Sequence, residues 1–114
     1  MLNEIKEKLL EVDPVVYYGI VDSNRREMAW DYIVFERSKI VFNQNKSSRS
    51  YYITVHIIRE NFVPEGFEQT VIDKLCEIAG MRVSGDPDFQ YVQKPNTNIV
   101  VEVLSIEFVL PVKG

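Results

Sequence analysis

Residues 51–59 read Tyr-Tyr-Ile-Thr-Val-His-Ile-Ile-Arg, and this stretch decides the fold. In an extended chain, successive side chains point to opposite faces. One face then carries Tyr51, Ile53, Val55 and Ile57, and the other carries Tyr52, Thr54 and His56. This alternation predicts a β-strand that lies with one face against the core.

A second β-rich block, Asp31–Phe42, precedes this strand, and the pair Arg37-Ser38 predicts a kink within it. The two blocks flank the polar tract Asn-Gln-Asn-Lys-Ser-Ser-Arg-Ser at residues 43–50. This tract is longer than an ordinary hairpin loop of about two to five residues. It contains Lys46 and Arg49 but no acidic residue. We therefore predict a long hairpin loop at 43–50 that contacts another macromolecule.

Two segments have the apolar spacing of amphipathic helices. The first covers residues 2–12 and ends at Asp13-Pro14, because the residue before a proline is disfavoured in helical conformation. The second opens at Pro64-Glu65-Gly66, where proline and acidic side chains suit the first turn of a helix, and Gly80 is expected to end it.

Three further strands complete the prediction, at residues 15–21, 89–92 and 99–110. The apolar positions of the last strand change phase, which predicts a β-bulge near Val103–Leu104. The expected order is α-β-β-β-β-α-β-β. Helices segregated from a mostly antiparallel sheet predict a single α+β domain over residues 1–114, with two helices packed on the sheet.

Composition indicates an ordinary globular domain. The chain has 114 residues, 46% of them hydrophobic and 26% charged, with a net charge of −4. This acidity argues against a dedicated nucleic-acid-binding protein, which usually carries a basic domain. The start of the chain lacks the apolar region of a secretion signal, and no apolar run approaches the roughly 20 residues that span a bilayer. We expect no membrane association, and a protein that acts in the cytoplasm or in something assembled there.

The residues that usually carry chemistry are sparse. His56 and Cys76 are each the only residue of their kind, so a thiol–imidazole pair is arithmetically possible but structural zinc is not expected. Cys76 lies in an amphipathic helix, where a free cysteine is usually a small buried hydrophobic residue. We predict no catalytic residues, no cofactor and no metal.

Contact surfaces are the stronger prediction. Arg25 and Arg26, and the loop with Lys46 and Arg49, are candidates, because binding residues concentrate on loops held by a rigid scaffold. Trp30 is a further candidate, since tryptophan is enriched at interfaces. The alternative for Arg25 and Arg26 is a solvated turn, and the alternative for the Lys46/Arg49 segment is a mobile loop. The alternative for Trp30 is packing in the core.

The element order and the character of the strands resemble those of a known family. The relevant stretches are Val16-Tyr17-Tyr18-Gly19, the strand Trp-Asp-Tyr-Ile-Val-Phe at 30–35 and the strand Tyr-Ile-Thr-Val-His-Ile at 52–57. With the two helices and the polar hairpin, nearly the whole chain resembles the tail terminator, or tail-completion, proteins of long-tailed bacteriophages and prophages.

This resemblance implies an α+β fold and a ring, usually of about six subunits. The ring would cap the head-proximal end of the tail tube, stop growth of the tube protein and offer a surface to the head connector. DNA would only pass through the lumen. The location would be the virion tail, assembled in the cytoplasm of the bacterial host, and the family offers no catalytic residues to transfer.

A closed ring needs two different patches on each subunit. One hypothesis places the Lys46/Arg49 loop, with Arg25 and Arg26, on the first patch. The second patch would be an acidic face of Glu65, Glu68 and Asp73. Two other hypotheses stay open: a small ligand-binding or regulatory domain with Trp30, Tyr32 and Tyr52 in an aromatic pocket, and an enzyme that acts through His56 and Cys76.

Overall fold

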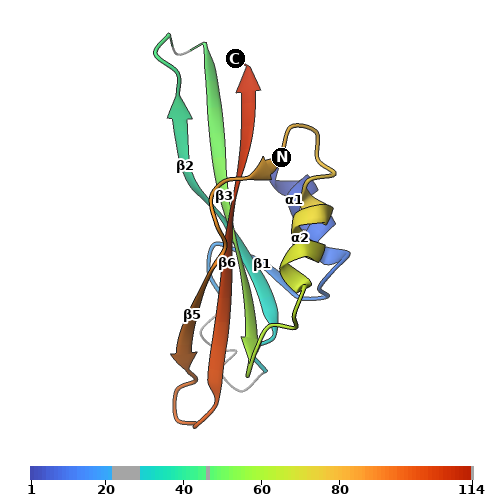
Figure 1. The fold of residues 1–114 in the computed structure, drawn as a ribbon, viewed down its shortest axis with the longest axis vertical. Helices are drawn as coiled ribbons and strands as arrows, with labels where there is room; N and C mark the ends of the chain where they lie inside the picture. Colours follow the sequence, from blue (N-terminus) through green and yellow to red (C-terminus); the bar gives the residue numbers. More distant parts are fainter. Residues whose placement is uncertain (22–28, 46, 114) are drawn as a thin grey trace.

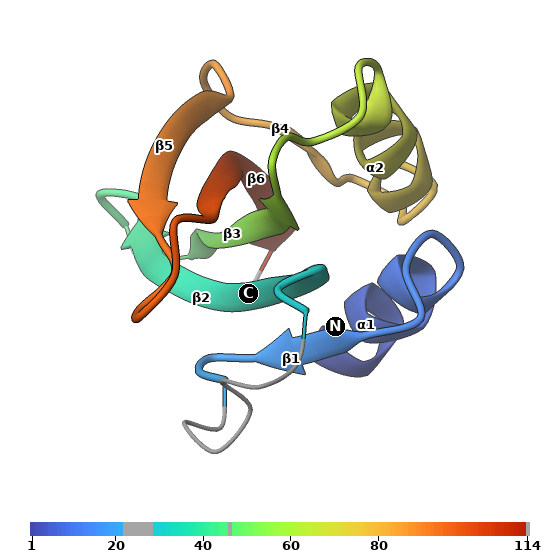
Figure 2. The same cartoon turned by 90° about the horizontal axis from the view of Figure 1, so that it is seen from below.

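The computed structural model describes residues 1–21, 29–45 and 47–113. In this part of the chain, helices α1 (Leu2–Leu10) and α2 (Phe67–Leu75) pack on one face of a twisted six-stranded sheet (Figures 1 and 2). The molecule is elongated, with principal extents of 51 × 25 × 24 Å. The predicted α+β class is confirmed. No helix in the described ranges has the length and apolar character needed to cross a membrane.

The sheet is built around two long central strands. Its strands are β1 (Val16–Tyr18), β2 (Tyr32–Phe42), β3 (Ser48–Glu60), β4 (Arg82–Val83), β5 (Asp88–Gln93) and β6 (Val100–Lys113). Their spatial order is β1-β2-β3-β6-β4, and β5 also pairs with β6. All pairs are antiparallel except β1 with β2.

The core lies between the helices and the alternating residues of β3 and β6. The predicted face of β3 is confirmed, because Ile53, Val55 and Ile57 are fully buried. They stand opposite Phe108, Ile106 and Leu104 of β6. The helices contribute Ile5, Leu9, Val71 and Leu75 to the same cluster. Each such side chain contributes roughly 1.5–3 kcal/mol through burial.

A buried ion pair fastens the end of α1 to the sheet. The Asp13 carboxylate accepts a hydrogen bond from Val15 N at 2.9 Å and one from Arg59 Nη2 at 2.6 Å. Arg59 comes from β3, and its guanidinium carbon lies 5.1 Å from the centre of the Phe67 ring at the start of α2. The pair therefore joins the α1–β1 connection, the sheet and α2.

The hairpin loop is shorter than predicted. β3 already begins at Ser48, so the turn covers only residues 43–47 instead of 43–50. Ser50 pairs with Val41 of β2 on one side and with Pro111 of β6 on the other. Pairing with β2 and with β6 keeps this polar segment in a β-strand, although its composition is typical of a loop.

The predicted bulge near Val103–Leu104 is wrong. The pairing of β6 with β3 is continuous from Ser48 to Glu60. The apolar pattern in the sequence changes phase because Glu102 is a charged residue on the same face as Leu104, the face toward the helices. Glu102 is nevertheless buried there, so the strand keeps one face against the core throughout. The kink predicted at Arg37-Ser38 is confirmed as a register shift between Arg37 and Lys39.

The first strand also differs from its prediction. It covers only Val16–Tyr18 rather than residues 15–21, and Gly19 follows it with a φ of +81°. β1 is parallel to β2, and the short strand β4 was not predicted. These differences arise from pairing partners that are distant in the chain.

Candidate interaction surfaces

The first predicted patch is only partly described. Arg25, Arg26 and Lys46 lie outside the residues that the structure describes. Arg49 lies in β3 and not in the loop. Its Nε donates a hydrogen bond to the Tyr51 hydroxyl at 2.7 Å, and its guanidinium carbon is 5.6 Å from the centre of that ring. Arg49 is therefore a half-buried charge held on the sheet.

Trp30 connects the start of β2 to the end of β3. Its backbone N–H donates a hydrogen bond to Glu60 Oε2 at 2.5 Å. Lys94 Nζ lies 3.3 Å from the same carboxylate oxygen and 6.0 Å from the centre of the Trp30 ring. Trp30 is half-buried, and these contacts favour the packing interpretation over exposure at an interface.

One end of the sheet carries apolar side chains that stay in contact with water. We call residues 37–50 the basic hairpin, because they contain Arg37, Lys39, Lys46 and Arg49 but no acidic residue. Figure 1 shows its turn projecting beyond the helices. Ile40, Val41 and Phe42 are 44%, 44% and 54% exposed. An apolar group of this kind on a strand is typical of a surface that contacts another protein.

The same end has free strand edges. β1 pairs with β2 only up to Phe35, and β4 pairs with β6 only at Phe108 and Val109. Beyond these points the outer edges of β2 and β6 have no strand partner within the described residues. Such edges present unpaired N–H and C=O groups that can bind another chain.

The connection between β3 and α2 forms a pocket in the half of the molecule away from the basic hairpin. Asn61, with a φ of +74°, turns the chain away from β3, and Gly66, with a φ of +85°, starts α2. Asparagine and glycine tolerate this left-handed conformation better than other residues. The two turns bring the intervening segment over β6 and β5.

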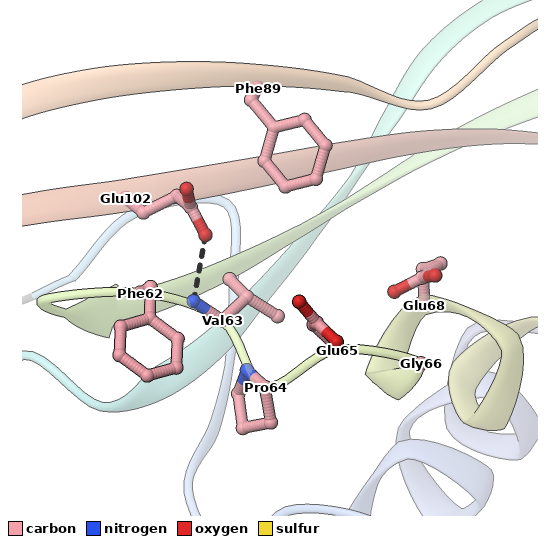
Figure 3. Close-up of a pocket in the computed structure, with 8 residues that line it drawn as sticks. All are labelled: Phe62, Val63, Pro64, Glu65, Gly66, Glu68, Phe89 and Glu102. Atoms are coloured by element: carbon pink, nitrogen blue, oxygen red, sulfur yellow. Dashed lines mark hydrogen bonds between the residues drawn. The ribbon is translucent and has the colours of Figure 1, made fainter.

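The pocket has a volume of about 350 Å³, and we call it the acidic pocket. It is lined by Phe62, Val63, Pro64, Glu65, Gly66, Glu68, Phe89 and Glu102 (Figure 3). Glu102 is only 8% exposed, and its Oε1 accepts a hydrogen bond from Val63 N at 2.7 Å. Hydrogen bonding to the Glu102 carboxylate raises the pKa of Tyr91. The hydrogen bond from Val63 N thus holds the buried Glu102 carboxylate in place within the pocket lining.

The second predicted patch is therefore brought together only in part. Glu65 and Glu68 both line the acidic pocket, but Asp73 does not. Asp73 accepts a hydrogen bond from Gln69 Nε2 at 2.7 Å on α2. Sequence reasoning missed Phe89 and Glu102, since they join the pocket only through the pairing of β5 with β6. The one local signal was Glu102, an acid within an apolar strand.

His56 and Cys76 are not brought together. His56 points to the face of the sheet opposite the helices, whereas Cys76 follows α2. Cys76 is exposed and not buried as predicted, because the helix has already ended at Leu75. Partial burial and, to a smaller extent, the charge of Asp73 raise the pKa of its thiol. A raised pKa disfavours the reactive thiolate.

His56 instead belongs to a polar row across three strands. Its Nε2 lies 3.0 Å from Glu36 Oε1, and its Nδ1 lies 2.7 Å from Ser105 Oγ. Ser105 lies in the middle of β6, with backbone partners in both β3 and β5. The nucleophilic serine of an α/β-hydrolase stands on a sharp strand-to-helix turn instead. We interpret these side-chain contacts as a structural link between β2, β3 and β6.

The aromatic residues of the ligand-binding hypothesis lie apart. Tyr32 stands opposite Ile58 and packs edge-on against Tyr17, at 5.6 Å between ring centres. Tyr52 stands opposite Lys39, whose ammonium group lies 4.7 Å from the centre of the ring. Six positions along β3 separate the two sites, or roughly 20 Å.

The chain matches no model of a protein family, and no curated protein is significantly similar to it in sequence.

Proposed function

We propose that this protein is a structural subunit of a ring that caps the head-proximal end of a phage tail tube, as tail terminators do. The resemblance in element order and strand character supports this proposal. One structural observation carries it further: the sheet extends beyond its helices and exposes Ile40, Val41 and Phe42 beside free strand edges.

An end of this kind is stabilised when another surface covers it. Exposed apolar side chains gain about 25 cal/mol per Å² when another surface covers them. Free edges and apolar groups at one end, and a differently built pocket in the other half of the molecule, are the two dissimilar patches that head-to-tail contacts need. Head-to-tail contacts close into a ring when the rotation between subunits allows it. The net charge of −4 suits a lumen that lets DNA pass without strong phosphate binding.

Electron microscopy and light scattering test the proposal. We expect the chain to form rings of about six copies, alone or when mixed with its cognate tail tube protein, and the tubes to stop growing when it is added. Phe42→Lys, which places a charge in the exposed apolar group, should weaken assembly. Glu7→Lys on the exposed side of α1 is the control. A chain that stays monomeric and leaves tube length unchanged would refute the proposal.

A further inference from the structure

The charges of the chain are segregated between two segments. The basic hairpin, residues 37–50, has four basic residues and no acidic one, and residues 60–73 have four acidic residues and no basic one. Figure 1 places the turn of the hairpin at one end of the long axis and the β3–α2 connection toward the other. A single copy therefore cannot bring its own two segments together.

The acidic pocket has the chemistry of a site for a cationic side chain. Phe62 and Phe89 offer aromatic rings that are 68% and 51% exposed. Figure 3 shows the Phe89 ring facing the space beside the carboxylates of Glu65 and Glu68, whereas the Phe62 ring points away from it at the rim. Aromatic faces attract ammonium and guanidinium groups, and their apolar surface also accepts the methylene stem of lysine or arginine. The carboxylates add charge-assisted hydrogen bonds and repel anions.

The basic hairpin carries matching groups. Lys39 is exposed beside the Tyr52 ring, and Arg49 is held against Tyr51. Lys39 shares its face of the hairpin with Val41, which can cover the exposed Phe89 ring. Arg49 shares the opposite face with Ile40 and Phe42. Both the charges and the apolar groups of the two segments are thus complementary.

We propose that the acidic pocket binds the basic hairpin of a second copy of this chain, with the exposed Lys39 side chain inserted beside Phe89 toward Glu65 and Glu68. This inference rests on the proposed function in that it names the contact that repeats around the ring. Each copy donates its hairpin to one neighbour and accepts the hairpin of the other.

A charge-swap experiment tests the pairing. One variant reverses the pocket, Glu65→Lys with Glu68→Lys, and the other reverses the hairpin, Lys39→Glu with Arg49→Glu. Alone, each variant opposes like charges at every contact, and association should weaken roughly ten- to a hundredfold. An equimolar mixture restores opposite charges at every contact and should regain the assembled mass in sedimentation velocity. Circular dichroism verifies that each variant is folded.

Zero-length crosslinking gives a second readout that detects weak association. In a mixture of isotope-labelled and unlabelled wild-type chains, a carbodiimide should join Lys39 of one copy to Glu65 or Glu68 of another. Lys6 on α1, also exposed, is the internal control and should yield no such crosslink.

The outcomes separate this inference from the proposed function. Rings that persist in both variants, or a mixture of folded variants that does not recover, would overturn the pocket contact and leave the ring intact. Absence of the Lys39 crosslink at high protein concentration would overturn it as well. Crosslinks in a chain that forms no ring and leaves tubes unchanged would support the contact and refute the tail-terminator function.

Discussion

The buried pair of Asp13 and Arg59 offers a sharp test of what holds the fold together. Asp13→Asn keeps an oxygen to accept the hydrogen bond of Val15 N but removes the charge that faces Arg59 at 2.6 Å. Asp13 is 3% exposed and the Arg59 side chain 17% exposed, so little water reaches the guanidinium that is left behind.

The expected loss follows from this burial. Removing one partner of a buried ion pair costs about 3–5 kcal/mol. Arg59 keeps hydrogen bonds to the carbonyl oxygens of Ile58 and Tyr32, so we expect the lower limit, about 3 kcal/mol. For a chain of this length, each kcal/mol shifts the midpoint of thermal unfolding by roughly 4 °C, which gives about 12 °C.

Urea unfolding, followed by the fluorescence of Trp30 and by circular dichroism, measures the loss. Glu11→Gln is the matched control, because Glu11 is 54% exposed and pairs with Lys74 at 3.3 Å. Surface pairs of this kind contribute less than about 1 kcal/mol. Adding Arg59→Met to Asp13→Asn should recover part of the loss, since no charge then stays unpaired. A loss of stability in Asp13→Asn no larger than that of the control would contradict this expectation.

Three further predictions concern the core and two titratable groups. Phe108→Ala should destabilise the fold by about 3–5 kcal/mol in the same urea assay, because the ring is fully buried. Cys76 should react with iodoacetamide in the native state, more slowly than a free cysteine because its pKa is raised, and faster as the pH increases; labelling only after unfolding would contradict this. Hydrogen bonding to Lys8 lowers the pKa of Glu77 from its ordinary 4.5, so this group stabilises the fold above that pH and loses the effect as the pH falls through the lowered pKa. Glu77→Gln should therefore be slightly less stable than wild type at neutral pH and equal to it in acid.

Periodic burial explains which parts of the fold the sequence could predict. The alternation at residues 51–59 and the helical spacing at 2–12 report which face of an element meets the core, and both predictions are confirmed. The helix predicted to open at Pro64-Glu65-Gly66 is also local, and α2 begins directly after Gly66, but it ends at Leu75 and not at the predicted stop, Gly80. Such features depend on neighbours within one or two turns of the chain.

The missed features depend on partners far away in the chain. Ser48 to Ser50 look like a loop, but hydrogen bonds to β2 and β6 hold them in a strand. Glu102 suggested a change of face in β6, whereas the chain segment at Val63 supplies the donor that lets a carboxylate stay buried. Only part of the acidic pocket could be predicted. Glu65 and Glu68 are close in sequence, whereas Phe89 lies near them only because β5 pairs with β6.

The position of β6 also bears on how the protein is made. β6 follows all the other elements in the chain, yet it lies between β3 on one side and β4 and β5 on the other. The core of the sheet therefore cannot close until β6 has been synthesised, because Leu104, Ile106 and Phe108 belong to it. Until then, the apolar face of the β2–β3 hairpin and the edge of β3 that pairs with β6 stay uncovered. Pairing between strands that are far apart in the chain is slow, and uncovered surfaces of this kind favour aggregation. Completion of the sheet therefore depends on the 14-residue strand β6, which covers the edge of β3 as well as part of the core.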